Sequence, residues 1–166
     1  MDGPPTFAAD AMLGKLARWL RLLGYDCFYE RDIDDARLIE LCRREGRILL
    51  TRDRRVASKS PRALFVPPGN LDAELLTVYR AIGGTPPDEP PTTRCSLCNA
   101  LLVAVAPSSL AEGAVPERVR TDHGEVWRCP ACARVYWRGT HVESMAERLA
   151  RLRARLAEGG VVAPRG

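Results

Sequence analysis

Two Cys-x-x-Cys pairs constrain the second half of this 166-residue chain more than any other feature. Cys95 and Cys98 form the first pair, and Cys129 and Cys132 form the second. Two such pairs can bring four thiolates into tetrahedral reach, and Zn²⁺ accepts a closed Cys₄ set without redox chemistry. The spacing therefore predicts a structural zinc site, with no position left open for catalysis. A disulfide or four free thiols is the alternative, and it fits poorly with the cytosolic chain expected below.

The region around these cysteines reads as a small zinc ribbon. Residues 101–105 and 135–137 are predicted strands, and 107–124, rich in small residues and prolines, is predicted to be a loop. So small a sheet cannot fold by apolar burial alone, so zinc is expected to hold it. The two remaining cysteines, Cys27 and Cys42, are expected to be buried small hydrophobic residues.

A proline-rich stretch, TPPDEPPTT at 85–93, separates the cysteine region from the first half. Proline fixes φ and removes a hydrogen-bond donor, so we expect an extended linker there. The predicted organisation is a domain over 5–84, a linker over 85–93, a zinc ribbon over 94–143, a helix over 144–158 and a disordered tail over 159–166. The helix carries one narrow apolar stripe, which favours docking on protein over a membrane: Met145, Leu149, Leu152 and Leu156.

The first half alternates short apolar runs with helical patterns, which is typical of βαβ units in an α/β fold. Strands are predicted at 7–9, 25–29, 47–51 and 63–66, and helices at 12–23 and 71–82. A further helix is predicted to open at Asp34 or Asp35 and to close at Gly46.

Three aspartates stand where ligands gather in such a fold. Asp10 and Asp53 follow predicted strands, and Asp35 stands at a predicted helix start. The carboxyl ends of parallel strands meet at one edge of a sheet. Clustered carboxylates repel unless a hard cation such as Mg²⁺ or Mn²⁺ neutralises them, and such an ion can activate water against a phosphate. Each aspartate also has a structural alternative: Asp10 can cap the helix that follows it, Asp35 can be an N-cap, and Asp53 can be a turn residue.

Basic residues surround these acids. Eight basic residues against two acids lie between Arg43 and Arg62, which is the electrostatic pattern of a phosphate-binding surface, although it is also the pattern of a solvated face. We expect RNA contacts from the basic side chains nearest the aspartates: Lys15, Arg18, Arg21, Arg52, Arg54 and Arg55.

The segment YWRGTH adds an aromatic pair beside an arginine. Trp137, Arg138 and His141 are candidates for stacking on unpaired bases and for contacting RNA. Packing of Trp137 between the ribbon and the first domain is the alternative.

The stretch DARLIELCRREGRILLTRD resembles the second half of PIN-type ribonuclease domains. DAMLGKLARWLRLLGYD, LLTRD, RCSLCN and CPACARVYWRGTH together are similar to the Mut-seven C-terminal RNase family, a PIN-like domain followed by a zinc ribbon. The resemblance runs from Phe7 to about Met145. It implies a three-layer domain with a small parallel sheet, and a divalent-metal-dependent endoribonuclease or an RNA-binding derivative of one. By the motif match, Asp10, Asp35 and Asp53 would be the metal carboxylates. Asp34 is a rival to Asp35.

Three functions are therefore compared. A divalent-metal-dependent ribonuclease is our first prediction, and a non-catalytic RNA-binding protein with a structural ribbon is the alternative. The appended ribbon argues against the third, the toxin of a toxin–antitoxin pair. No apolar stretch approaches the ~20 residues of a membrane span, and the N-terminus does not resemble a signal peptide, so a cytoplasmic location with no membrane partner is expected.

Overall fold

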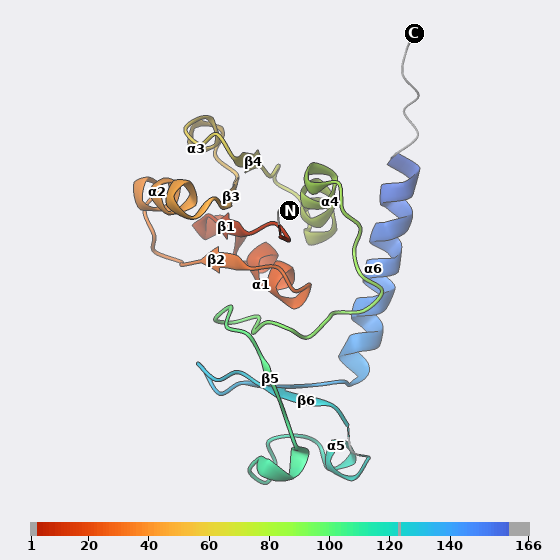
Figure 1. Ribbon diagram of the computed structural model, residues 1–166. Helices are drawn as coiled ribbons and strands as arrows, with labels where there is room; N and C mark the ends of the chain where they lie inside the picture. The colour runs from red at the N-terminus through yellow and green to blue at the C-terminus, as the bar shows by residue number, and fades with distance from the viewer. Residues whose placement is uncertain (1–2, 123, 160–166) are drawn as a thin grey trace.

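A computed structural model describes residues 3–122 and 124–159 and contains two separate sheets (Figure 1). The first sheet is parallel, with the strand order β2-β1-β3-β4. Its strands are β1 (Phe7–Ala9), β2 (Cys27–Tyr29), β3 (Ile48–Thr51) and β4 (Ala63–Phe65). The two middle strands, β1 and β3, contain the most fully buried residues, as expected for strands covered on both faces.

Helices connect these strands and begin and end where the sequence supplies caps. A 3₁₀ turn (Ala11–Leu13) leads into α1 (Gly14–Leu22), and α3 (Arg54–Ser58) follows β3. The helix α2 (Asp35–Glu45) is capped by the Asp34 side chain, which accepts from the Arg37 backbone N–H at 2.9 Å, and it ends at Gly46 with φ 67°. The helix α4 (Leu71–Ile82) begins in the same way at Asn70. The short α3 was not predicted.

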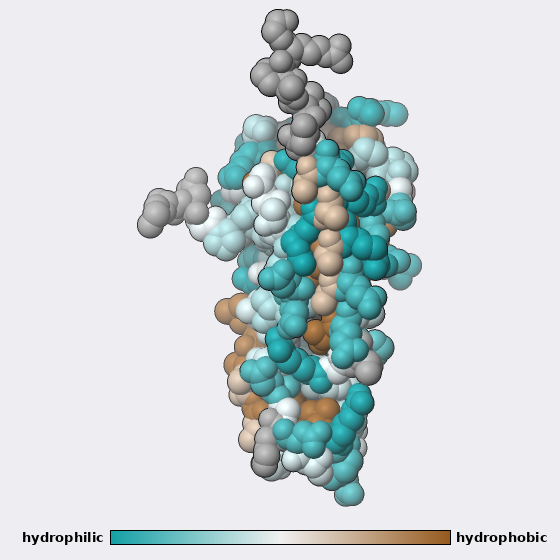
Figure 2. Space-filling model, turned by 90° about the vertical axis from the view of Figure 1, so that its right-hand side faces the viewer, coloured by the Kyte–Doolittle hydropathy of each residue, from teal (hydrophilic) through white to brown (hydrophobic). Residues whose placement is uncertain are grey.

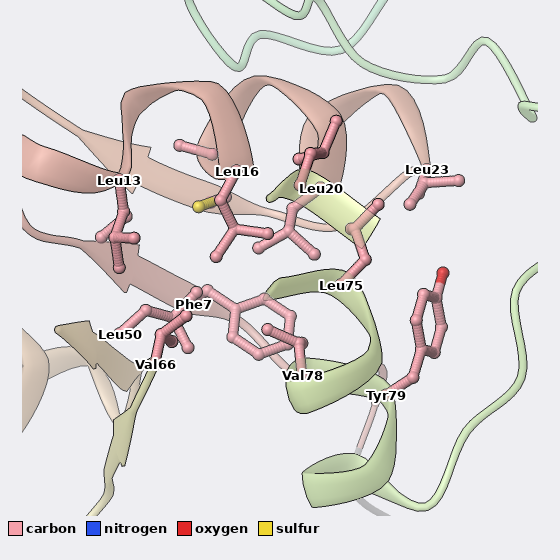
Figure 3. Packing of buried hydrophobic residues seen from close by; sticks show 14 of the residues in the cluster. Phe7, Leu13, Leu16, Leu20, Leu23, Leu50, Val66, Leu75, Val78 and Tyr79 are labelled. Carbon is pink, nitrogen blue, oxygen red and sulfur yellow. The ribbon is translucent and has the colours of Figure 1, made fainter. Parts of the chain in front are cut away.

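The helices cover both faces of the parallel sheet and bury a core on each. On one face, α1 and α4 contribute leucines that surround Phe7 and Leu50, and Figure 3 shows these side chains pointing toward one another. On the other face, Leu38 and Cys42 of α2 pack with Val56 of α3 against the sheet. The predicted three-layer, PIN-like α/β domain is therefore confirmed, as is the burial of Cys27 and Cys42.

The second sheet is antiparallel and belongs to the cysteine region. It orders β5 (Val103–Val105), β6 (Val126–Arg128) and β7 (Val135–Trp137). The prediction of a plain loop over 107–124 was wrong in part, because a 3₁₀ turn (Pro107–Ser109) and the helix α5 (Glu117–Thr121) form there. Val115 and Val119, four residues apart, place α5 against Val126 and the ring of Trp137.

The last helix, α6 (Thr140–Gly159), begins four residues before the predicted start and runs alongside α4 (Figure 1). Leu149 and Leu152 are buried in the same core as α1 and α4, so the apolar stripe packs inside the chain. The face seen in Figure 2 is mostly hydrophilic; a narrow, weakly hydrophobic strip runs down its upper half, and more strongly hydrophobic residues show in its lower part and along its left-hand edge. The predicted tail lies outside the described residues except for Gly159.

None of the helices within 3–122 and 124–159 combines the length and the apolarity needed to cross a bilayer.

Candidate metal sites

The four cysteines of the two pairs converge on one point. The Sγ atoms of Cys95 and Cys132 lie 3.6 Å apart, and those of Cys98 and Cys129 lie 3.4 Å apart. All four sulfur atoms lie within 4.8 Å of one another. A tetrahedral site with Zn–S bonds of about 2.3 Å requires sulfur separations of about 3.8 Å. The donor set and its spacing therefore fit a structural zinc ion.

Each pair is a tight turn in which backbone N–H groups point at sulfur. The Cys98 N–H approaches the Cys95 Sγ at 3.5 Å, and the Cys132 N–H approaches the Cys129 Sγ at 3.4 Å. The residue after the first pair, Asn99, has φ 70°, and the residue after the second, Ala133, has φ 61°. A left-handed backbone closes both turns, and Asn tolerates it better than Ala.

The thiol of Cys95 is also contacted by a phenol. The Tyr136 hydroxyl lies 3.1 Å from the Cys95 Sγ and accepts from the Ser96 backbone N–H at 3.0 Å. Burial opposes ionisation of Cys95, but the Tyr136 hydrogen bond and the backbone N–H groups of Cys98 and Leu97 outweigh it and lower the pKa of this thiol to about 6. At Cys98 the Ala100 backbone N–H favours the thiolate, yet burial and hydrogen bonds to the other three cysteines raise the pKa. The chain thus prepares Cys95 as a thiolate ligand.

The first cysteine turn is joined to the parallel-sheet domain by a buried arginine. The guanidinium of Arg21 in α1, only 3% exposed, donates to the Leu97 carbonyl at 2.7 Å and to the Ser96 carbonyl at 3.3 Å. It also donates to the Cys27 carbonyl at 2.8 Å. Burial lowers the pKa of this guanidinium, which nevertheless remains a cation at neutral pH. Arg21 therefore connects the first cysteine turn to α1 and β2.

Asn99 and Asp26 complete this joint. The Asn99 side chain accepts from the Cys27 backbone N–H at 3.2 Å and donates to the Asp26 carboxylate at 2.8 Å. Asp26 also accepts from Arg47 at 2.7 Å and lies 3.8 Å from the Arg94 guanidinium. Burial raises the pKa of Asp26, but the hydrogen bonds from Arg47 and Asn99 and the charges of Arg47 and Arg94 outweigh it, so its pKa lies below the usual range.

Asp10 stands at the carboxyl end of β1. Its side chain is only 8% exposed and accepts from the Met12 backbone N–H at 3.0 Å and from the Arg52 backbone N–H at 2.9 Å. One of these donors starts the turn before α1, and the other follows β3. The carboxylate is therefore held between the ends of two neighbouring strands, and each of its oxygens keeps a second lone pair for a further ligand.

Asp53 stands two residues beyond β3 and caps α3. One of its oxygens, Oδ1, accepts from the Arg55 and Val56 backbone N–H groups at 2.7 and 3.3 Å. Of the two rivals at α2, Asp34 is the N-cap, and Asp35 is an exposed residue of the first turn. The capping alternative for Asp10 is thus realised. Asp53 caps α3, where a turn residue was the alternative, and Asp34 rather than Asp35 is the N-cap of α2. Asp53 and Asp35 remain open to solvent.

The three predicted carboxylate ligands are not gathered as closely as the cysteines. Among the residues that the structure describes, the four cysteines are the only group of three or more Cys, His, Asp or Glu side chains with ligand atoms within 4.8 Å of one another. Asp10 and Asp53 share one edge of the sheet because β1 and β3 pair in parallel, with Ala9 opposite Leu50. A metal at this edge would be held by separated carboxylates.

The predicted RNA-contacting residues fall into two sets. Lys15 and Arg18 of α1 and Arg55 of α3 are exposed, as is His141 at the start of α6. The others make protein contacts. Arg21 is buried in the joint, Arg52 pairs with Glu74, and Arg54 lies 4.1 Å over the ring of Phe65. Arg138 pairs with Glu89 at 2.6 Å, and Trp137 packs partly against the apolar cluster of its own sheet.

Sequence reasoning missed Asn99 and Glu74 altogether; it considered Asp26 as a further acid and Tyr136 as one of the aromatic pair, but it missed their structural roles. Asn99 had a usable signal, since a Cys-x-x-Cys turn closes with a left-handed residue and Asn is the commonest choice after Gly. The others carried none, because their partners lie far away in sequence, as with Glu74 and Arg52 at 22 positions.

Of the comparisons with known proteins, the one with family models gives a match. The family model described as the Mut7-C RNAse domain matches residues 5–149, a range that contains β1, β3 and both cysteine pairs. No curated protein and no solved structure matches the chain. The match covers far more than half of the 166 residues. The chain therefore belongs to the Mut7-C RNAse domain family.

Proposed function

We propose that this protein is a divalent-metal-dependent ribonuclease that hydrolyses RNA phosphodiester bonds at the edge where β1 and β3 end. The observation that carries the proposal is the position of Asp10. Its carboxylate is nearly buried at the carboxyl end of a central strand and is oriented by backbone N–H groups from two different segments. Family membership supports a ribonuclease-like activity on RNA.

Asp10 and Asp53 would hold the ion, and Asp35 is the third proposed ligand. Carboxylate oxygens are the donors that Mg²⁺ and Mn²⁺ prefer, and Mg²⁺ usually keeps several waters beside one or two carboxylates. A site of separated carboxylates is compatible with that habit. When bound, such an ion activates water and offsets the charge that builds on the phosphate.

The chain's own cations would hold the RNA. Arg55 follows Asp53 in α3, and Lys15 stands in the first turn of α1, directly after the turn that Asp10 caps. Both are exposed. Phosphate groups beside the reacting one can therefore meet a positive charge on either side of the carboxylates. We leave Arg21 out of the proposed contacts because its guanidinium is already bound to three carbonyls.

A specific observation favours the second candidate, a non-catalytic RNA-binding protein. The side chains of Asp10 and Asp53 both serve as caps, and within residues 3–122 and 124–159 no three carboxylates lie within one ion's reach. In this candidate the aspartates are structural, and the basic surface alone acts.

Asp53→Asn separates the two candidates, because Asn caps a helix as well as Asp does but carries no charge. Labelled RNAs are incubated with Mn²⁺ or Mg²⁺ and the zinc-loaded protein. The ribonuclease predicts cleavage by wild type that Asp53→Asn loses with little change in melting temperature. Asp34→Asn, a cap of α2, serves as the matched control and keeps activity if Asp35 is the ligand. No cleavage by wild type, or equal cleavage by both proteins, would favour the binding candidate.

A further inference from the structure

A cleft of about 590 Å³ opens between α1, the strand β7 and the start of α6. Its walls combine aromatic and aliphatic side chains with cations: Arg18, Leu22, Arg134, Val135, Tyr136, Trp137, Gly139, His141 and Met145. The volume lies within the ~300–1,000 Å³ of small-ligand pockets, so a nucleobase fits inside. The three elements come from both halves of the chain and meet near the lower end of α6 in Figure 1.

The charge around this cleft has one sign. Arg18 and Arg134 are the charged residues that line it, and no aspartate or glutamate does. In the part of the chain that the structure describes, Arg18 and Arg134 enter no salt bridge, in contrast to the neighbouring Arg138, which pairs with Glu89 and Glu125. A cation left without an acidic partner beside apolar walls suits a ligand with a flat apolar face and a negative charge. A base with its phosphate is such a ligand.

One face of α1 runs from the turn capped by Asp10 to the cleft. Lys15, Arg18 and Leu22 are spaced by three and four residues, so they follow one face of α1. Seven residues of helix span about 10 Å, from the turn capped by Asp10 to the cleft. One RNA strand can therefore occupy both places, with the Lys15 cation between them.

Contacts with the two cysteine turns hold one wall of the cleft in place. The Arg134 carbonyl accepts from the Cys129 backbone N–H at 2.8 Å, and the Tyr136 hydroxyl is bound to Ser96 in the first cysteine turn. The aromatic wall is thus fixed before any ligand arrives, which lowers the entropic cost of binding.

We propose that this cleft binds an unpaired nucleobase of the same RNA strand whose phosphate lies at Asp10 and Asp53. The inference rests on the proposed function, since it assigns the single-stranded RNA substrate a second contact. Apolar contact with the base and the cations Arg18 and Arg134 supply the binding, so the protein prefers single-stranded over double-stranded RNA.

The test measures binding of a fluorescein-labelled oligouridylate of roughly ten nucleotides by anisotropy, using zinc-loaded full-length protein without Mg²⁺ or Mn²⁺. Met145→Lys adds a positive charge but replaces an apolar wall, so we expect roughly tenfold weaker binding, whereas simple charge attraction predicts tighter binding. The double variant Arg18→Ala/Arg134→Ala should also bind roughly tenfold more weakly. Its charge-matched control, Arg151→Ala/Arg155→Ala, changes two exposed arginines outside the cleft and should lose less.

Unchanged or tighter binding by Met145→Lys, or equal losses in the two double variants, would overturn the inference. Retained zinc and an unchanged melting temperature establish that the variants are folded. The proposed function is tested separately. If wild type does not cleave RNA while Met145→Lys still weakens binding, base binding in the cleft is supported and the ribonuclease function is refuted. If Asp53→Asn abolishes cleavage while Met145→Lys binds RNA as tightly as wild type, the ribonuclease function is supported and base binding in the cleft is refuted.

Discussion

Replacing Arg21 by Met should weaken the contact between the first cysteine turn and the parallel-sheet domain. Met keeps most of the aliphatic stem and a similar helix propensity, so the substitution removes little besides the guanidinium. Three carbonyl groups then lose their donor, those of Cys27, Ser96 and Leu97. Two of these carbonyls belong to the first cysteine turn, so the loss falls on the contact between the two parts of the chain.

The magnitude follows from those hydrogen bonds. A hydrogen bond to a charged group contributes about 1.5–3 kcal/mol, and two of the three are short, at 2.7 and 2.8 Å. The third, at 3.3 Å, is weaker, and release of the guanidinium from its buried site offsets part of the loss. We expect the free energy of unfolding to fall by about 3 kcal/mol. In a chain of this size that corresponds to a drop in Tm of roughly 6–12 °C.

Thermal and urea unfolding of the zinc-loaded proteins measures this difference. Arg18→Met is the matched control, since it makes the same change on the same helix at an exposed position. We expect the control to differ from wild type by no more than about 0.5 kcal/mol. If Arg21→Met also stays within about 1 kcal/mol of the control, the buried guanidinium does not join the two parts, and the reasoning from its carbonyl contacts is refuted.

Three further predictions use the same proteins. Asp26→Asn should lower stability at neutral pH. Because the folded pKa of Asp26 lies below its unfolded value, the contribution of its carboxylate is complete above the unfolded pKa and is lost as the pH falls through the folded pKa, so the urea curves of variant and wild type should converge in acid. A difference that persists unchanged in acid would contradict this. Cys98→Ser should lose bound zinc, as measured by elemental analysis, because it removes one of the four thiolates. Cys42→Ala changes a core cysteine outside the cluster and should retain one ion per chain. Zinc in both variants would argue against the Cys₄ site. Leu152→Ala should lower the free energy of unfolding in urea by about 2–4 kcal/mol, because the Leu152 side chain is buried between α6 and the core. Leu156 is only partly buried, so Leu156→Ala should lower it by less. Two equally small losses would mean that α6 is not docked.

Much of the local structure could be predicted from short stretches of sequence. Asp34 and Gly46 bound α2 because a side-chain oxygen caps the first turn and a glycine accepts the left-handed end. The apolar strands at 7–9 and 48–51 and the two Cys-x-x-Cys turns follow from equally local rules. The family match covers all of these stretches, since it extends over residues 5–149.

The candidate sites were harder to predict from the sequence, because each depends on contacts between side chains and residues far apart in the chain. Arg18 and Arg21 look alike in sequence, yet one is exposed on the cleft and the other is buried under a turn 75 positions away. The sequence by itself determined the four cysteines that fit a zinc ion and the acids at the strand ends, since both follow from residue type and local spacing. Only the tertiary structure decided that Asp26 and Arg21 form a joint and that Arg18 lines a cleft, because burial and pairing are properties of surfaces that meet only after the chain has folded.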